Sequence, residues 1–412
     1  MSYFQTEPPV PSHLSFTVKE PLNREPGIGR LVSNFITSNE DGFDRNHGPI
    51  PHLSKDNHLL VIDGIVATPM ALSITELEES FPEYELTCAL QCAGNRRNHM
   101  GRMKPVRGVP WNDGAVMNCT WSGVLLRDVL LRAGVTSPFS ATSSAISNAT
   151  DSMDLGQDGR PKDVRDRELH VWFYCSSAAT QDERQGFGGS IPLSRALDPA
   201  YEVMLAMKMN GETLPVSHGY PIRAIVPGQL GARSVKWLDR ITISVEESFS
   251  YYQRRDYKIL PESVETIDEA NGTHTGGDGL GVWPHIESGG DMPVNSAIGI
   301  PASHTAVTLD QDGCIEVKGY ALPGGENGPV IKVEVSTDDG DTWTEAQLSE
   351  NRGGKWCWSL WSARVKIERG EGKSIWSRAT DGCGHVQPRF PKWNLRGVMY
   401  NGYGEARGLI VL

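Results

Sequence analysis

The chain of 412 residues carries 39 Lys and Arg against 51 Asp and Glu, a formal net charge of −12 that argues against nucleic acid or an anionic membrane as its main partner. Its length predicts two domains rather than a single core. With 38% hydrophobic and 22% charged residues, and no apolar stretch near the roughly 18 residues that span a bilayer, it is typical of a globular, soluble protein.

Helix and strand patterns are mixed in the first third of the chain. Pro, Asn and Gly without a sustained period predict extended segments and turns over 1–50. Further along, the patterns predict a strand over 58–66, a helix over 73–81, a strand over 84–92 whose even-numbered residues share one face, and a helix over 121–135. Ser73 is expected to begin the first helix and Gly134 to end the second.

The middle of the chain continues this mixture. Residues 137–169 are polar and predict a surface excursion. Strands are expected over 220–228 and 239–248, on either side of residues 231–238. Strands and helices do not alternate regularly, which indicates a mixed α+β domain.

A change of composition separates the last part of the chain. Seven of the twenty residues from 271 to 290 are glycine, which indicates a linker or a long loop. Apolar and polar residues then alternate over 314–322, 330–348, 355–367 and 374–382 without a helix, which predicts a β-sandwich of about 100–120 residues, the size of an immunoglobulin-like domain. We therefore expect a first domain over 1–265, a Gly-rich linker over 266–292 and a β-sandwich over 293–412.

The cysteines and the N-terminal residues bear on the compartment. Seven cysteines, an odd number scattered over a long chain, favour reduced thiols over a disulfide framework. No basic segment followed by an apolar one is visible at the start, so no secretory signal is expected. The expected location is cytoplasmic, with an organelle such as a peroxisome or mitochondrion left open.

The stretch LQCAGNRR, residues 90–97, places Cys92 before an Ala-Gly-Asn turn and two arginines. Guanidinium groups favour the thiolate, and the turn could fold Arg96 and Arg97 back over the sulfur, so one hypothesis is a thiolate that binds a metal or attacks a substrate. The alternative is a buried structural cysteine followed by two surface arginines. Zinc is disfavoured because no second ligand pair accompanies Cys88, Cys92 and His99.

Basic residues recur in loops at 44–51, 217–223 and 231–237. Arg, Lys, Ser and backbone N–H groups are what phosphate recognition uses. Each loop alone is an ordinary turn, but their recurrence in an acidic chain favours an anion site. No complete P-loop, dinucleotide-binding glycine motif, nucleophile elbow or H-E-x-x-H motif is present, which lowers the nucleotide and hydrolase alternatives.

A set of motifs in a fixed order carries a family resemblance. The stretches are FITSNEDGFDRNHGPIP, TCALQCAGNRR, KPVRGVPWNDGA, WSGVLLRDVLLRAG, SIPLSRALDP, MNGETLPVSHGYPIRAIVPGQLGARSVKWL, QRRDYK and WNLRGV. The chain thus resembles the sulfite oxidase family of molybdenum-molybdopterin enzymes, which includes the molybdenum domain of assimilatory nitrate reductases. The resemblance implies a mixed α+β cofactor domain followed by an immunoglobulin-like dimerisation domain, and hence a homodimer.

Residue roles follow from this resemblance. It implies that the Cys92 thiolate is the protein's ligand to molybdenum, beside the pterin dithiolene, so the arginines act on the substrate rather than on the thiol. The implied catalytic residues are Arg45, Arg97, Trp111, Tyr257 and Arg396. The implied cofactor-binding residues are Phe43, Asp44, Arg45, Asn46, His47, Cys175, Ser176, Ser177, His218, Arg223, Ser234, Val235 and Lys236. The plain alternatives are a core tryptophan for Trp111 and a surface-turn tyrosine for Tyr257.

The activity that the resemblance implies is the oxidation of sulfite to sulfate by oxygen-atom transfer, with one cofactor per chain. The haem-binding cytochrome segment of some members is not seen, so oxygen or an external acceptor would take the electrons. Nitrate reductases carry methionine and asparagine where this chain has Arg396 and Tyr257, and extra positive charge suits a doubly charged oxyanion, so nitrate reduction is the second choice. Ser177 stands where the family usually has an aspartate, with Asp182 nearby, and the C-terminal tail lacks the family's Trp-His-Arg.

Overall fold

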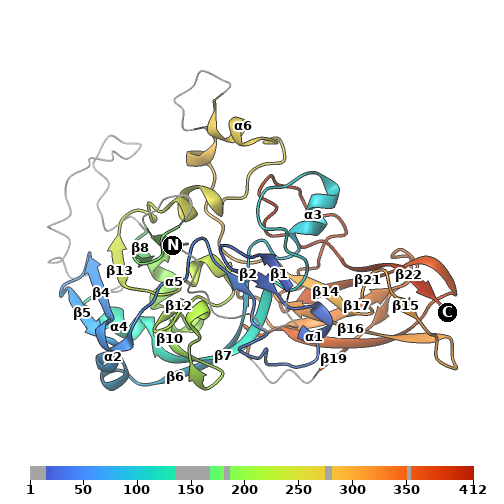
Figure 1. Ribbon diagram of the computed structural model, residues 1–412, viewed down its shortest axis with the longest axis horizontal. Helices are drawn as coiled ribbons and strands as arrows, with labels where there is room; N and C mark the ends of the chain where they lie inside the picture. The colour runs from blue at the N-terminus through green and yellow to red at the C-terminus, as the bar shows by residue number, and fades with distance from the viewer. Residues whose placement is uncertain (1–14, 136–167, 181–185, 274–280, 350–353) are drawn as a thin grey trace.

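The computed structural model describes residues 15–135, 168–180, 186–273, 281–349 and 354–412. Two strand-rich parts lie side by side, one built mainly from residues before 257 and the other from residues after 293 (Figure 1). Within the described ranges, no helix is both long and apolar enough to cross a membrane.

Three sheets form the N-terminal part. The first is antiparallel and joins β1 (Ser15–Val18), β2 (Asn23–Glu25) and β3 (Asp44–Arg45). The second has the order β11-β10-β7-β6 with β12 on β10, from β6 (Tyr84–Gln91), β7 (Val116–Leu125), β10 (Met204–Met209), β11 (Glu212–Thr213) and β12 (Arg223–Ile225). The third has the order β5-β4-β13-β8-β9, from β4 (Leu59–Gly64), β5 (Met70–Ser73), β8 (His170–Cys175), β9 (Phe187–Pro192) and β13 (Arg240–Ser244).

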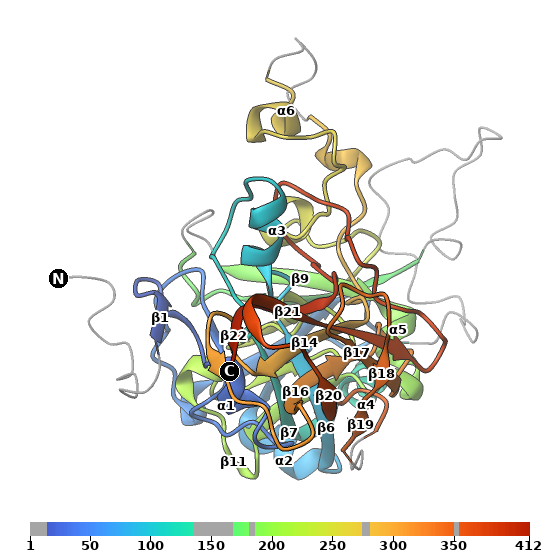
Figure 2. The same cartoon turned by 90° about the vertical axis from the view of Figure 1, so that its right-hand side faces the viewer.

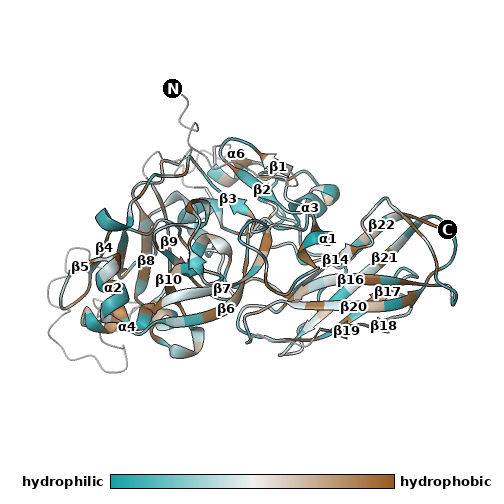
Figure 3. Cartoon of the chain, turned by 60° about the horizontal axis from the view of Figure 1, so that its bottom comes forward, coloured by the Kyte–Doolittle hydropathy of each residue, from teal (hydrophilic) through white to brown (hydrophobic). Residues whose placement is uncertain are grey.

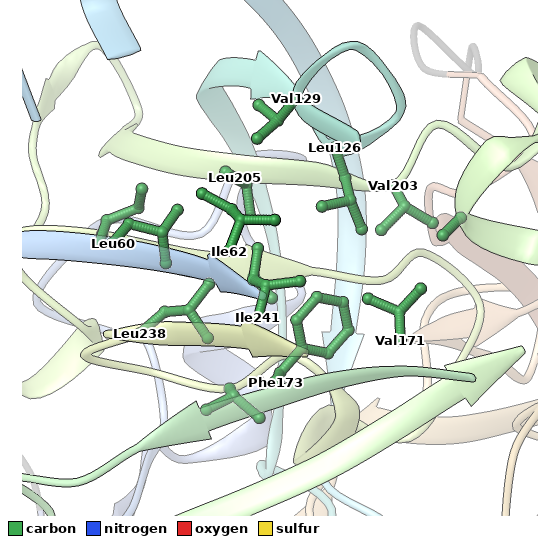
Figure 4. Packing of buried hydrophobic residues seen from close by; sticks show 14 of the residues in the cluster. Leu60, Ile62, Leu126, Val129, Val171, Phe173, Val203, Leu205, Leu238 and Ile241 are labelled. Carbon is green, nitrogen blue, oxygen red and sulfur yellow. The ribbon is translucent and has the colours of Figure 1, made fainter. Parts of the chain in front are cut away.

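The main core lies between the second and third sheets. Side chains of β4, β8 and β13 meet those of β10 and of the short helices α2 (Ile74–Ser80), α4 (Leu126–Arg132) and α5 (Leu193–Leu197) (Figure 4). Strand β10 is buried on both faces, because Leu205 and Met207 join this core whereas Met204, Ala206 and Met209 join the cluster beneath Cys92. The second sheet is therefore a central layer at β10, whose sequence Met204–Met209 is apolar except for Lys208.

The helix predicted over 121–135 is wrong in its first third. Residues Trp121–Leu125 belong to β7, where Trp121 pairs with Leu86 on one side and Met209 on the other, and the helix begins only at Leu126. Burial on both faces removed the alternation that marks a strand. Gly123 was a local signal of close strand packing, because a Cβ there would clash with the carbonyl of Leu205.

Several other predicted elements are confirmed. Ser73 begins α2 with a full capping box to Glu76, and Gly134, with φ of 75°, directly follows the end of α4. The strand predicted over 84–92 is β6. The strand predicted over 220–228 is shorter in the structure, where only Arg223–Ile225 pair with a neighbouring strand. Pro221 and Pro227 lie on either side of this segment and have no N–H to donate to a sheet. The excursion at 137–169 lies almost entirely outside the described residues.

Residues 295–411 form two sheets without a helix among the residues described there. One has the order β14-β16-β20-β19, from β14 (Asn295–Ile300), β16 (Cys314–Leu322), β19 (Gln347–Leu348) and β20 (Ser359–Lys366). The other has the order β15-β22-β21-β17-β18, from β15 (Ala306–Val307), β17 (Val330–Ser336), β18 (Thr344–Glu345), β21 (Gly370–Asp381) and β22 (Gly404–Val411). An apolar core drawn from both sheets lies between them, and Figure 3 shows these strands gathered at one end of the molecule.

The described part of the Gly-rich segment packs against the first part of the molecule. Helix α6 (Ile267–Asn271) begins with a capping box at Thr266 and projects from the body beyond α3 (Arg97–Met103) (Figures 1 and 2). Trp283 is buried with Met100 and Trp393, and the Met292 N–H donates to the carbonyl of Gly228. These contacts fix the path of the chain between the two parts, while the domain boundaries stay a prediction.

Candidate active site

Cys92 lies at the end of β6, where the strand runs into a tight turn. Its backbone N–H donates to the Ala115 carbonyl, and its carbonyl accepts from the Asn95 N–H, each at 2.9 Å. The side chain is 5% exposed, and the Gly94 N–H lies 3.4 Å from the sulfur, which accepts this hydrogen bond. The sulfur is therefore fixed in position with one face toward a cavity.

About 750 Å³ of space free of protein atoms, part of it open solvent, lies within this cavity. Predicted site residues on its wall are Phe43, Arg45, Asn46, His47, Cys92, His218, Arg223, Ser234, Lys236 and Tyr257. No Asp or Glu lines it within the described ranges. In a chain of net charge −12, an acid-free wall with several cations indicates an anionic ligand.

The two arginines after Cys92 point in different directions. Arg97 follows the prediction: burial lowers its pKa, and Cys92, Arg45 and Tyr257 are the charged or titratable groups that act on it. Its Nε donates to the Arg396 carbonyl at 3.0 Å and its Nη1 to the Val109 carbonyl at 2.7 Å. The side chain is enclosed by glycines, since a Cβ at any of three glycines would lie within 2.7 Å of it, namely Gly94, Gly108 and Gly397.

Arg96 instead turns away from the sulfur, which corrects the expectation that both arginines fold back over it. Its backbone is left-handed, with φ of 66°, and its side chain is fully buried. The guanidinium donates to Asp113 at 3.0 Å, to Asn295 Oδ1 at 2.7 Å and to three carbonyls, of Ser296, Gly402 and Tyr403. Arg96 therefore joins the Cys92 turn to the C-terminal sheets.

Basic side chains line the same cavity as the sulfur. Arg223 donates to the carbonyls of His218 at 2.7 Å and Ser234 at 2.9 Å, while Lys236 Nζ donates to Asn46 Oδ1 and to the Ser217 carbonyl. Burial lowers the pKa of Lys236 to about 7, that of Arg223 to about 10 and that of His218 to about 4. The protein alone does not fully compensate these charges, which fits a phosphate-bearing ligand.

Asp44 is the one acid beside this wall, although it does not line the cavity. It is 1% exposed, pairs with Arg24, and its Oδ1 lies 3.8 Å from His218 Nδ1. Burial raises its pKa, but the cations His218, Arg24 and Lys236 outweigh burial and hold it below the usual value. A single carboxylate thus faces several cations here.

A second group lies where the cavity meets Tyr257. The Tyr257 hydroxyl and His47 Nε2 lie 3.2 Å apart, and Arg396 forms an ion pair with Asp256. Burial raises the pKa of Tyr257, partly opposed by Arg45 and Arg97, so the phenol stays protonated and can donate a hydrogen bond. Tyr257 follows a π-helix, Tyr252–Asp256, a feature frequent at functional sites. It is therefore not the surface-turn tyrosine of the plain alternative.

Other predicted residues lie off the cavity wall. Arg97, Trp111 and Arg396 are behind it, and Trp111 is fully buried with its ring 6.4 Å from that of Phe43. Val235 is part of the main core. The Trp111 indole N–H has no hydrogen-bond partner within the described part of the chain.

Cys175, Ser176 and Ser177 also lie away from the cavity. Cys175 is in the main core, where burial raises its pKa to about 12, and Ser176 donates twice to Asp239 Oδ2. The chain reaches the wall one residue after Ser177, at Ala178, and again at Thr180. Asp182 lies outside the described residues.

Sequence reasoning missed several residues of the wall. They are Gly48, Pro49, Leu90, Ala93, Met117, Ala178, Thr180, Phe187, Gly231, Ala232 and Trp237. Four of them, Gly48, Ala93, Ala178 and Trp237, directly follow a predicted residue, so adjacency was a usable signal for these four. Phe187 had none; it is placed by β9, and its ring lies 5.0 Å from that of His47.

The metal chemistry of the site depends on one protein sulfur. Among the described residues, no cluster of three or more His, Cys, Asp or Glu side chains could hold a metal ion. A metal here would therefore take its remaining ligands from a cofactor, which agrees with one soft thiol beside a large cationic cavity. The donor set and the wall fit molybdenum bound to a phosphate-bearing pterin.

Comparison with known proteins agrees with this chemistry. Residues 47–252 match the oxidoreductase molybdopterin binding domain, and residues 287–406 match the Mo-co oxidoreductase dimerisation domain. Sulfite oxidase of Gallus gallus is 38% identical over 403 residues, covering 96% of this chain and 78% of that protein. Mitochondrial sulfite oxidase of Homo sapiens is also 38% identical, and the chain spans 64% of its length.

A solved structure shares the fold. Sulfane dehydrogenase SoxCD from Paracoccus pantotrophus matches with a TM-score of 0.70 at 24% identity, covering 97% of this chain and 85% of that one. The matches indicate an oxidoreductase with a molybdenum-molybdopterin cofactor, and the dimerisation domain indicates a homodimer. The chain belongs to the sulfite oxidase family of molybdenum-molybdopterin oxidoreductases.

Proposed function

We propose that this protein oxidises sulfite to sulfate at one molybdenum-molybdopterin centre per chain, with Cys92 as the protein ligand. The observation that carries the proposal is the Cys92 sulfur, fixed at the edge of a cavity whose described lining residues include cations but no acid. Two electrons would leave to oxygen or to a separate acceptor.

The cofactor would supply the oxygen-atom transfer and the two-electron redox change, and the chain would hold it in place. We assign the pterin and its phosphate to the wall formed by His218, Arg223, Ser234 and Lys236 together with segment 43–47. An anionic phosphate would compensate the buried cations and restore the pKa of Lys236 upward from about 7. Val235 and residues 175–177 lie off the wall, so they would act only through neighbours that line it, namely Ser234, Lys236 and Ala178.

The substrate would bind on the side of Tyr257. Arg45, Arg97 and Arg396 supply positive charge, and a sulfite or sulfate anion would be held by their N–H groups. Asp256 orients Arg396 through the ion pair, and the protonated Tyr257 hydroxyl would donate to an oxyanion oxygen. Trp111, packed on Phe43, would keep water from the back of the pocket.

The alternative is reduction of nitrate or oxidation of another oxyanion. Arg396 and Tyr257 favour sulfite, because nitrate carries one charge and needs fewer cations than a dianion. Assays of sulfite-dependent ferricyanide reduction and of nitrate reduction by a reduced dye distinguish the two. We expect activity in the first and not in the second; the reverse result would replace sulfite with nitrate.

We further propose that residues 293–412 are an immunoglobulin-like domain through which two chains associate, with 1–265 as the cofactor domain and 266–292 between them. The two sheets and the apolar core between them support this proposal. Light scattering on the loaded protein should give the mass of two chains. Removing the C-terminal part would also remove Arg396, so truncation would not test the proposal cleanly.

A further inference from the structure

Strand β2 contains three consecutive buried polar residues, Asn23, Arg24 and Glu25, which are 1%, 6% and 9% exposed. The strand precedes the region matched to the molybdopterin binding domain. It has β1 on one side and β3 on the other, with Asn23 opposite Arg45 and Arg24 opposite Asp44. Burying three consecutive polar side chains costs free energy unless each is hydrogen-bonded or ion-paired. The partners of each side chain therefore show which segments the strand holds in place.

Asn23 fixes the segment that carries Arg45. Its Oδ1 accepts from Arg45 Nη1 at 3.2 Å and from the Asn46 N–H at 3.0 Å. Its Nδ2 donates to the carbonyls of Pro21 at 2.9 Å and Asn46 at 3.2 Å. Every donor and acceptor of this amide is engaged, so its orientation and that of Arg45 are coupled.

Glu25 fixes the segment that follows Trp111. Oε1 accepts from the Asn112 N–H at 2.8 Å and from its side-chain Nδ2 at 3.1 Å, and Oε2 accepts from the Gly114 N–H at 2.9 Å. Gly114 permits this approach, because a Cβ there would lie 3.2 Å from Oε2 and clash with the Pro26 carbonyl. The carboxylate thus closes the turn next to Trp111.

Arg24, on the opposite face of the strand, holds the residues just before Arg45. It pairs with Asp44, and its Nη1 donates to the Glu40 carbonyl at 3.0 Å. Asp44 in turn faces His218 on the cavity wall. One three-residue strand therefore contacts two separate segments of the site, 40–46 and 112–114.

We propose that β2 is a positioning strap for the site: Asn23 orients Arg45 for the substrate anion, and Glu25 holds the Trp111 turn. This inference rests on the proposed function for the role of Arg45. A cationic group binds an anion strongly only when its direction is set in advance, so a neighbour that saturates its other N–H groups contributes to affinity without touching the ligand. Asn23 and Glu25 are positioning residues, not catalytic ones.

For Asn23 the test uses purified, molybdenum-loaded Asn23→Ala and Asn23→Asp. Asn23→Ala should raise the KM for sulfite roughly tenfold with kcat changed less than about threefold and molybdenum content unchanged, as for loss of one hydrogen bond to a charged group. Asn23→Asp keeps the oxygen that accepts from Arg45 but places a second oxygen against the carbonyls of Pro21 and Asn46, so it should recover only part of the affinity. Asn327→Ala, a half-buried asparagine remote from the cavity, is the matched control.

Hydrogen exchange gives a readout that does not depend on activity. Burial raises the pKa of Glu25 to about 7, so exchange is measured at about pH 8, where the carboxylate is ionised. In Glu25→Gln the side chain replaces one acceptor oxygen with an NH2 group, so amide exchange in peptides covering 112–114 should become about tenfold faster, as expected for one lost hydrogen bond to a charged group. Glu78→Gln, which changes an exposed carboxylate paired with Lys55, should leave these peptides unchanged.

The outcomes separate the strap from the proposed function. If KM and exchange both stay at the wild-type values, or if Asn23→Ala lowers only molybdenum content or thermal stability, the strap is overturned. If the wild-type protein does not oxidise sulfite, the proposed function fails, and the exchange experiment on cofactor-free protein still decides whether β2 holds the Trp111 turn.

Discussion

The wall of the cavity and the core of the C-terminal sheets are buried to a similar degree but are made of opposite chemistry. The core between the two C-terminal sheets is mainly apolar, with side chains such as Val333, Ile375 and Leu409. The wall contains the buried Arg223 and the half-buried Lys236, with Asp44 as an acid beside them, while His218, with a pKa of about 4, is neutral near pH 7. Apolar burial stabilises the fold directly, whereas buried cations cost free energy until an anion binds. Buried cations that lower the stability of the ligand-free protein therefore indicate where an anionic ligand binds.

Arg96 differs from both regions, because it is a buried cation whose charge is compensated by partners within the protein. It is as buried as the wall arginines, but its guanidinium donates to Asp113, Asn295 and three carbonyls, and it lies 4.8 Å from the centre of the Tyr400 ring. The protein compensates it completely. Adjacent arginines thus serve different purposes: Arg96 joins the two parts of the molecule and Arg97 faces the site.

The largest expected effect is that of Cys92→Ser. Loss of the soft sulfur ligand should lower sulfite turnover by more than about 1,000-fold, because an uncharged hydroxyl does not replace a thiolate as a ligand. Steady-state assays normalised to protein measure this change. Cys88→Ala, on the same face of β6 but in the apolar cluster, should keep most of the activity; equal loss in both variants would remove the special role of Cys92.

Arg96→Met should reduce stability rather than catalysis. Removing this cation takes one hydrogen-bond donor from each of Asp113, Asn295 and three carbonyls of the C-terminal part, which should lower the free energy of unfolding by about 3–5 kcal/mol. Urea denaturation of the cofactor-free protein measures this difference. The exposed Arg364, paired with Asp310 and Asp312, is the control, and its change to Met should have little effect. Comparable losses would contradict the compensated role of Arg96.

Arg396→Met should act on the substrate. We expect the KM for sulfite to rise about 100-fold, or about 2.7 kcal/mol, with molybdenum content unchanged, since one of three cations for the anion is lost. Arg389→Met removes an exposed arginine from the same segment and should leave KM within about twofold, since it lies outside the anion pocket. Unchanged sulfite affinity in Arg396→Met would show that the pocket does not use this residue.

The smallest effect depends on pH. Burial lowers the pKa of Lys236 from 10.5 to about 7 in the folded, cofactor-free protein, so between these values the unfolded chain binds one more proton and stability rises with pH. Below about pH 7 the Lys236 amine is protonated in both the folded and the unfolded state, so the folded protein bears the full free-energy cost of the buried charge. Lys236→Met removes the buried charge and with it this cost. The unfolding free energy of the variant should therefore exceed that of wild type by more at pH 6 than at pH 9, and the two gains should differ by more than about 1 kcal/mol.

A control from the apolar core sharpens this pH prediction. Ile375→Val should lower the unfolding free energy by about 0.5–1.5 kcal/mol at both pH values, because a deleted methylene does not titrate. Equal pH dependence in the two variants would mean that Lys236 has an ordinary pKa in the folded protein.

Local signals predicted much of the fold. The capping box at Ser73, the stop at Gly134 and the alternation in the C-terminal strands depend on neighbours in sequence, and the structure has them. The error over 121–135 arose because β7 is buried on both faces, and nothing in a local window reveals the second covering layer. The packing of Trp283 against Met100 and Trp393 is likewise set by tertiary contacts.

Site residues that belong to recognisable sequence motifs could be predicted, whereas residues that act through partners far away in the sequence could not. Cys92, Arg45 and Lys236 stand in recognisable stretches, and all three line the cavity. Asn23 and Glu25 do not: their partners are about 20 and 90 residues away, and an isolated polar residue in an extended segment has no periodic signal. The opposite directions of Arg96 and Arg97 follow from the left-handed backbone at Arg96, which sequence spacing does not show.

The central claim is that the Cys92 sulfur binds molybdenum in a cavity built for an anionic cofactor. Molybdenum K-edge X-ray absorption on the loaded wild-type protein and on Cys92→Ser tests it most directly. The account predicts one sulfur neighbour fewer around molybdenum in the variant, with the metal still present. An identical number of sulfur neighbours in the two proteins would contradict it.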